Sequence, residues 1–105
     1  MQQFTLYRNR NPSTRTVFPL LLDVQSSLLE DLQTRVVIPL TRKSRLAGEP
    51  VGHLMPVIEF EHDTYVLVTQ HLAGIARAEL GAPAGSLARQ RDAIISALDF
   101  LFTGF

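Results

Sequence analysis

The sequence contains no cysteine, and none of its apolar runs is long enough to span a membrane. The absence of cysteine excludes disulfide bonds and thiolate chemistry, which fits a reducing compartment. The first residues also lack the apolar segment that a secretory signal peptide requires. We therefore expect a soluble, cytoplasmic protein that does not interact with membranes.

An excess of either charge is also missing, since ten basic residues balance ten acidic residues. Obligate nucleic-acid-binding proteins are usually basic, so this balance argues against direct, sequence-specific recognition of DNA or RNA. The charge is nevertheless uneven: residues 1–50 carry seven basic and four acidic side chains, whereas residues 51–105 carry three and six. The basic half either forms a patch for an acidic partner or is ordinary solvated surface.

The motifs of common catalytic and cofactor sites are missing as well. The sequence has no phosphate-binding loop, no dinucleotide-binding glycine motif and no nucleophile elbow. His53, His62 and His71 are nine residues apart, a spacing that matches no compact metal-ligand motif. We therefore predict no cofactor and no metal site.

Four charged residues could carry chemistry, but each has a simpler interpretation. Glu59, Glu61 and Asp63 would lie on one face of a strand, as a general-acid pair or as a solvated face. Arg35 interrupts an apolar segment and is either a phosphate ligand or, more commonly, an edge residue with its charge in water. No catalytic residues are predicted.

The apolar pattern predicts several strands followed by one helix. Residues 3–8, 17–24, 34–40, 53–61 and 64–70 are expected to be strands, with Pro39 at a strand end or edge and Pro56 at a bulge. His62 and Asp63 would form a hairpin turn. Residues 73–85 are expected to be a linker with at most one short strand, and the helix would run from an N-cap at Ser86 to a stop at Gly104. This order predicts a single α+β domain, residues 1–105, with a mostly antiparallel sheet.

Apolar residues occur where they are not expected in two places. Leu28 and Leu29 are adjacent in a polar connecting segment, where a short helical turn could bury one of them. Phe102 and Phe105 lie at the end of the predicted helix, and their rings either fold back into the core, which composition favours, or form a contact surface. Together with the basic loops, these residues suggest a protein that acts by binding other proteins.

Four segments, in this order, resemble the CcdB toxins. They are Asp23-Val24-Gln25-Ser26 followed by Leu28-Leu29, the run from Arg35 to Leu40, the run from Leu54 to Ile58, and the closing Phe102-Thr103-Gly104-Phe105. The resemblance extends over the whole chain and implies an SH3-like, mostly antiparallel β-barrel with a small extra β-sheet, a C-terminal α-helix and a homodimer. It further implies a non-enzymatic toxin of a type II toxin–antitoxin system, of the kind that serves in plasmid maintenance. Such a toxin binds the DNA gyrase A subunit, traps the gyrase–cleaved DNA complex as a topoisomerase poison, and is neutralised by a CcdA-like antitoxin.

The resemblance also implies which residues would contact gyrase. Carried over position by position, they are Leu28, Leu29, Asp99, Phe102, Thr103, Gly104 and Phe105. Three of these depart from the best-known member, which has tryptophan, asparagine and isoleucine at the positions of Thr103, Asp99 and Phe105. The threonine removes a ring that stacks in the gyrase site, so a weaker or species-shifted poison is expected.

Charge alone predicts where an acidic antitoxin segment would bind. The basic loops could attract it electrostatically through Arg8, Arg10, Arg15, Arg42, Lys43 and Arg45.

Two other functions are compatible with the sequence. MazF-like toxins share the barrel and cleave RNA, in which case Arg15, Thr16 and Arg35 would be the first candidates for the reaction. A homologue that has lost gyrase poisoning is the third interpretation, and Thr103 in place of tryptophan is the feature that favours it.

Overall fold

A computed structural model describes residues 2–104. Within them the chain forms seven strands, several short 3-10 turns and one α-helix. The strands are β1 (Thr5–Asn9), β2 (Leu20–Asp23), β3 (Thr34–Arg42), β4 (Val57–Phe60), β5 (Asp63–Leu67), β6 (Ala73–Ala76) and β7 (Leu80–Ser86). The 3-10 turns are η1 (Ser27–Leu29), η2 (Lys43–Arg45), η3 (Thr69–His71), η4 (Arg77–Glu79) and η5 (Ala88–Gln90), and the helix is α1 (Arg91–Thr103).

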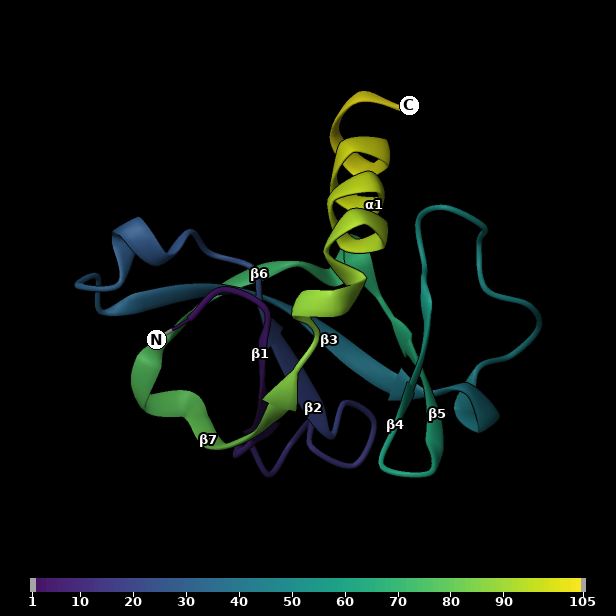
Figure 1. Ribbon diagram of the computed structural model, residues 1–105. Helices are drawn as coiled ribbons and strands as arrows, with labels where there is room; N and C mark the ends of the chain where they lie inside the picture. Colours follow the sequence, from purple (N-terminus) through teal and green to yellow (C-terminus); the bar gives the residue numbers. More distant parts are fainter. Residues whose placement is uncertain (1, 105) are drawn as a thin grey trace.

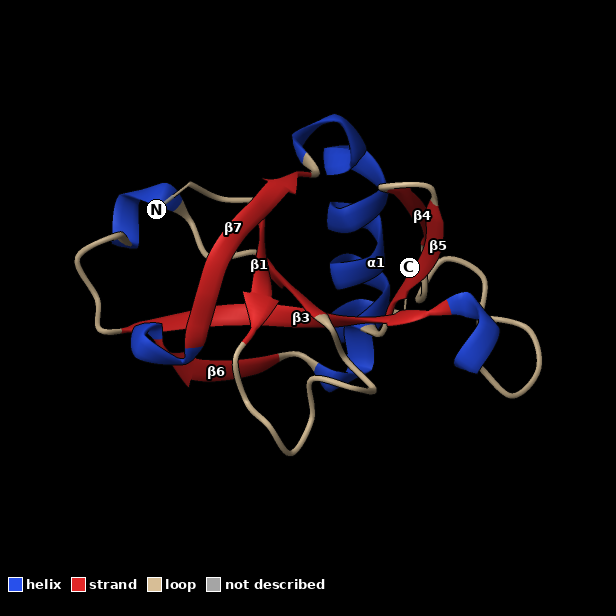
Figure 2. Cartoon of the chain, turned by 90° about the horizontal axis from the view of Figure 1, so that it is seen from below, coloured by secondary structure: helices blue, strands red, loops and turns tan. Residues whose placement is uncertain are grey.

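The strands form one curled antiparallel sheet in the order β4-β5-β3-β2-β1-β7, and β6 pairs with β3. α1 stands between the β1–β7 side of this sheet and the β4–β5 hairpin (Figures 1 and 2). The expected α+β class and SH3-like sheet with a C-terminal helix are therefore confirmed. The additional ladder beside the barrel is the pairing of β6 with the first half of β3, and it is continuous with the main sheet.

β2 is buried on both faces, as its unbroken apolar run predicts. Leu20 and Leu22 pack in the main core together with Leu87 and Ile94, which precede and belong to α1. Leu21 points to the opposite face and joins a second, smaller cluster. The chain therefore buries apolar side chains on both sides of its central strands.

β3 pairs with β2 along one edge and with two strands in succession along the other. β6 pairs with residues 34–37, and β5 pairs with residues 40–42. Pro39 lies at the break between these two ladders, and its carbonyl accepts a hydrogen bond from the Val68 amide at 2.9 Å. The expectation that Pro39 ends the strand or lies at an outer edge is wrong, because this break tolerates a missing amide inside a central strand.

The predicted hairpin is confirmed, but its turn is one residue earlier than expected. Phe60 pairs with Asp63, so Glu61 and His62 form the turn. Both turn residues have positive φ, 51° and 65°, as the mirror-image turns of tight hairpins require. Pro56 precedes β4, and the β4–β5 register continues without the bulge that was expected there.

β7 occupies residues that were expected to be mostly linker. Its small residues lack the apolar alternation by which a strand is predicted from sequence. Two of them, Gly81 and Gly85, are nevertheless required because neighbouring groups approach closely. A Cβ atom on Gly81 would lie 2.7 Å from the Arg8 carbonyl oxygen, and one on Gly85 would lie 2.7 Å from the Phe60 ring. The strand therefore has little apolar bulk of its own and is stabilised by its pairing with β1.

α1 begins four residues later than predicted because η5 precedes it. The Ser86 hydroxyl accepts a hydrogen bond from the Ala88 amide at 3.1 Å, at the start of η5, and the N-cap position of α1 is Gln90, not Ser86. The predicted stop is confirmed: Gly104 has φ 79°, and its amide donates to the Phe100 carbonyl at 3.0 Å.

Candidate protein-contact surfaces

The segment that joins β2 to β3, residues 26–32, is called the connector here. The Ser26 hydroxyl accepts a hydrogen bond from the Leu28 amide at 3.2 Å and so caps η1. The predicted helical turn is present but buries neither leucine: Leu28 is 94% exposed and Leu29 is 48% exposed. Leu32 is also about half exposed, so the connector presents three leucines to solvent.

The C-terminal end of α1, residues 99–104, is called the helix end. Phe102 is 70% exposed, so the expectation that its ring folds back into the core is wrong. The Thr103 hydroxyl donates to the Asp99 carbonyl at 2.6 Å, and both of these residues are exposed. Phe105 lies outside the described residues. The helix end therefore presents an aromatic ring flanked by polar groups, with Gly104 turning the chain away from the helix.

Phe100 is the member of the helix end that faces the rest of the molecule. Its ring lies 6.4 Å from the His53 ring, in a tilted arrangement. Beside this contact, an open groove of about 430 Å³ runs between α1 and residues 52–56. One side of the helix end is thus anchored while the opposite side, with Phe102, remains exposed.

The connector and the helix end do not form one continuous patch within a single chain. In Figures 1 and 2 η1 lies near the N-terminus, away from the C-terminal end of α1. The structure therefore exposes Leu28, Leu29 and Phe102 but does not bring the leucines and the ring together.

Two of the six basic residues assigned to antitoxin binding are paired with acids of the β4–β5 hairpin. Arg8 lies 2.9 Å from Glu61, and Arg42 lies 3.0 Å from Asp63. The third acid of the expected trio, Glu59, accepts a hydrogen bond from the Thr64 hydroxyl at 2.7 Å. These contacts give all three acids a structural explanation, which favours the solvated-face interpretation over a general-acid pair.

The other basic residues lie on exposed loops. Arg10 donates to the Ala78 carbonyl at 3.3 Å, while Arg15, Lys43 and Arg45 are exposed. Arg15 lies in the loop between β1 and β2, and Lys43 and Arg45 lie in the loop that follows β3; these are called the two basic loops. A groove of about 300 Å³ lies between them, and its lining includes Val17, Phe18, Arg45, Leu46, Met55 and His71. The two loops therefore lie on either side of a largely apolar groove.

Arg35 is the residue that the sequence interpretation placed wrongly. Its side chain is 0% exposed and forms a pair with the equally buried Asp23, so Arg35 is neither an edge residue nor an accessible phosphate ligand. Burial raises the pKa of the nearby Tyr7 hydroxyl, and the negative charge of Asp23 raises it further. The available signal was Asp23 itself, since an acid at the end of a buried strand needs a partner.

Within residues 2–104 no group of three His, Asp or Glu side chains is arranged to hold a metal ion. Nor does this part of the chain contain a helix with the length and apolar character that crossing a membrane requires.

The sequence pattern of the family described as CcdB protein matches residues 3–104. The chain belongs to the CcdB family. Membership in the CcdB family indicates a toxin of a toxin–antitoxin module.

A solved structure, an endoribonuclease in complex with its cognate antitoxin from a mycobacterial species, is similar to this CcdB-family chain. The TM-score is 0.74 at 14% sequence identity, and the match covers 96% of this chain and 93% of that chain. At this identity the similarity supports the fold alone.

Proposed function

We propose that this toxin binds the DNA gyrase A subunit and traps the gyrase–cleaved DNA complex, without an enzymatic activity of its own. The observation that carries the proposal is the exposed helix end, where Phe102 is 70% exposed in a chain of the CcdB family. The proposed contact residues are Leu28, Leu29, Asp99, Phe102, Thr103, Gly104 and Phe105. Exposed aromatic and aliphatic side chains of this kind are the usual anchors of protein interfaces.

A homodimer is part of the proposal. The connector and the helix end lie apart in one chain, so a single copy offers two separate contact surfaces (Figure 1). Two copies related by a two-fold axis would present each surface twice, which matches a target that is itself a dimer of A subunits.

The proposed antitoxin site is the pair of basic loops and the groove between them. An acidic segment would be attracted by Arg15, Lys43 and Arg45, and one of its apolar side chains would fill the groove beside Arg45. Arg8 and Arg42 would have to exchange Glu61 and Asp63 for acids of the antitoxin. Such binding would take place in the cytoplasm and would weaken as salt is raised.

An endoribonuclease is the second candidate, because the barrel is shared with an endoribonuclease. Of the three residues first considered for RNA cleavage, Arg35 is fully buried in its pair with Asp23 and cannot reach a substrate. Arg15 and Thr16 are exposed, but two exposed loop residues do not make a catalytic site. The structure therefore favours the non-enzymatic proposal.

The decisive experiment incubates the purified protein with gyrase from the source organism, ATP and closed circular DNA. Linear DNA released by detergent and protease measures trapped cleavage complexes. We expect linear DNA with the full chain, none with a truncation that ends at Phe102, and more with Thr103→Trp, because a tryptophan restores stacking surface.

Val51→Ser provides the matched control, since Val51 is an exposed apolar loop residue outside both surfaces. It should trap as much DNA as the wild type. If neither the wild type nor Thr103→Trp produces linear DNA, gyrase poisoning is refuted, and RNA cleavage by the same preparations becomes the next assay.

A further inference from the structure

The connector rests on a buried ion pair. The Arg35 guanidinium donates to Asp23 Oδ2 from Nε at 3.0 Å and from Nη2 at 2.7 Å, and both side chains are 0% exposed. Burying two charges is expensive even when they are well paired, and apolar residues of similar size would often stabilise a fold at least as well. The pair therefore calls for an explanation beyond stability.

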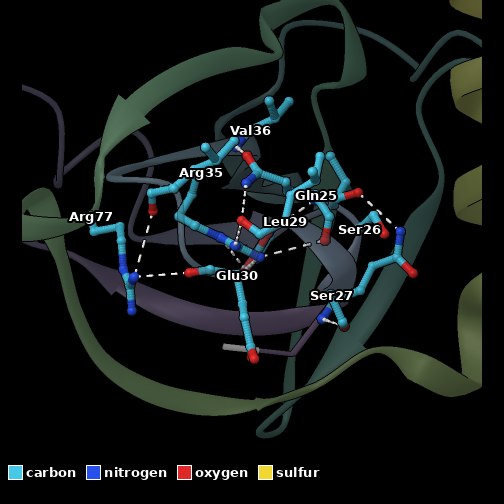
Figure 3. Close-up of polar contacts among 12 residues, drawn as sticks. Gln25, Ser26, Ser27, Leu29, Glu30, Arg35, Val36 and Arg77 are labelled. Atoms are coloured by element: carbon cyan, nitrogen blue, oxygen red, sulfur yellow. Dashed lines mark hydrogen bonds and ion pairs between the residues drawn. The ribbon is translucent and has the colours of Figure 1, made fainter.

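Gln25 and Arg35 each direct one donor to the connector, and both donors reach the Leu29 carbonyl. The Leu29 carbonyl accepts from Gln25 Nε2 at 3.1 Å and from Arg35 Nη1 at 3.4 Å. Asp23 Oδ1 in turn accepts the Gln25 amide at 3.0 Å, and Gln25 Oε1 accepts the Val36 amide at 3.0 Å. Asp23, Gln25 and Arg35 are called the polar frame, and part of this network is shown in Figure 3.

Two longer-range contacts hold the connector at its margins. The Gln3 amide donates to the Ser27 hydroxyl at 3.1 Å, and Arg77 Nη1 donates to the Glu30 carbonyl at 2.9 Å (Figure 3). Residues 27–32 themselves are all exposed. The connector is thus positioned through its polar groups and not by burial of its own side chains.

We infer that Gln25 and Arg35 are positioning residues that hold Leu28 and Leu29 outward for the contact with gyrase. The inference rests on the proposed function, because it concerns the same contact. A loop that is already ordered in its binding conformation avoids much of the entropy loss on association. The frame fixes the main chain at Leu29, so the two leucines face solvent while their backbone stays fixed.

The test combines amide hydrogen exchange with binding to the full-length gyrase A subunit. Gln25→Met removes both side-chain hydrogen bonds of Gln25 and leaves the ion pair in place. We expect amides of residues 26–32 to exchange roughly tenfold faster and gyrase affinity to fall roughly five- to tenfold, as the loss of one or two hydrogen bonds implies. Gln70→Met makes the same substitution at an exposed site and should change neither quantity.

A second variant separates positioning from stability. The double substitution Asp23→Leu with Arg35→Met replaces the ion pair by apolar side chains, so the protein should stay folded. It should nevertheless show the faster exchange and weaker binding of Gln25→Met. Binding at the wild-type level in either variant would overturn the inference.

Failure of the proposed function gives a different result. If the wild type does not bind gyrase, exchange alone decides whether the frame positions the connector. Faster exchange in Gln25→Met that is confined to residues 26–32 and to the Val36 amide, which loses its acceptor, would support positioning. Unchanged exchange of residues 26–32 would refute it.

Discussion

The connector and the helix end both expose apolar side chains, but they are held in opposite ways. The connector has three exposed leucines on a main chain that Gln25 and Arg35 hold through the Leu29 carbonyl. The helix end depends on its own helical hydrogen bonds, the Gly104 cap and one ring contact between Phe100 and His53.

If both surfaces bind partners as proposed, this difference predicts two modes of recognition on one small protein. A surface whose backbone is fixed presents one shape, so it favours a partner that already fits it. A helix terminus has fewer constraints, since its last turn is among the first parts of a fold to open. We therefore expect the connector to determine fit and the helix end to adapt to the partner.

The largest expected effect comes from breaking the polar frame. Asp23→Asn leaves the Arg35 charge buried without its partner, so we expect the free energy of unfolding to fall by about 3–5 kcal/mol. Asp99→Asn makes the same substitution in the exposed helix end and should change it by less than about 0.5 kcal/mol. Urea denaturation measures both values, and equal losses in the two variants would contradict the contrast.

The next effect concerns binding at the helix end. Phe102→Ala removes the exposed ring and should cost about 2 kcal/mol of gyrase affinity, or roughly 30-fold in Kd, if the ring is a hot spot. Stability should hardly change because the ring is 70% exposed. Titration of the gyrase A subunit measures the affinity, with Val51→Ala as the control. An unchanged Kd would remove Phe102 from the contact.

A smaller effect is expected at the helix cap. Gly104 has φ 79°, so Gly104→Ala introduces strain of about 1 kcal/mol and should loosen the last turn of α1. Gly52→Ala is the matched control because its added methyl group meets open space and its φ is not positive. Hydrogen exchange of the amides in the last turn of α1 compares the two variants. Equal exchange rates in Gly104→Ala and Gly52→Ala would show that the cap contributes little.

The smallest effect on stability is expected for Leu28→Ser. Its side chain is 94% exposed, so the free energy of unfolding should change by less than about 0.5 kcal/mol. Connector exchange rates should also stay at the wild-type level, because the frame contacts the main chain and not this side chain. A clear loss of stability in thermal or urea denaturation would show that Leu28 packs in the fold.

The sequence predicted the fold where local patterns are sufficient. The buried strand that contains Leu21, the hairpin near His62 and the helix stop at Gly104 each have a local signal in residue type and spacing. β7 has none, because its Gly, Ala and Pro residues carry no apolar alternation and its stability comes from β1. The groups that exclude larger residues at Gly81 and Gly85 are the Arg8 carbonyl oxygen and the Phe60 ring, and both come from other strands.

The candidate surfaces were partly predictable for a similar reason. Leu28 and Phe102 stand out because they are apolar among polar neighbours, and the structure leaves both exposed. Arg35 was misinterpreted because its partner, Asp23, lies on another strand, and pairing across strands is not visible in local spacing. That the two surfaces lie apart is likewise a property of the folded chain (Figure 2).

β3 also sets the distance between two proposed binding regions of the protein, the connector for gyrase and η2 for the antitoxin. The connector ends just before β3 begins, and the basic turn η2 follows the last residue of β3. The strand is nine residues long. At about 3.3 Å per residue, these two ends are separated by about 26 Å. An antitoxin segment anchored at η2 would need roughly eight further extended residues to shield Leu28 from gyrase. If the antitoxin is anchored at η2 as proposed, the length of β3 therefore sets a lower limit on the length of the tail that shields the connector.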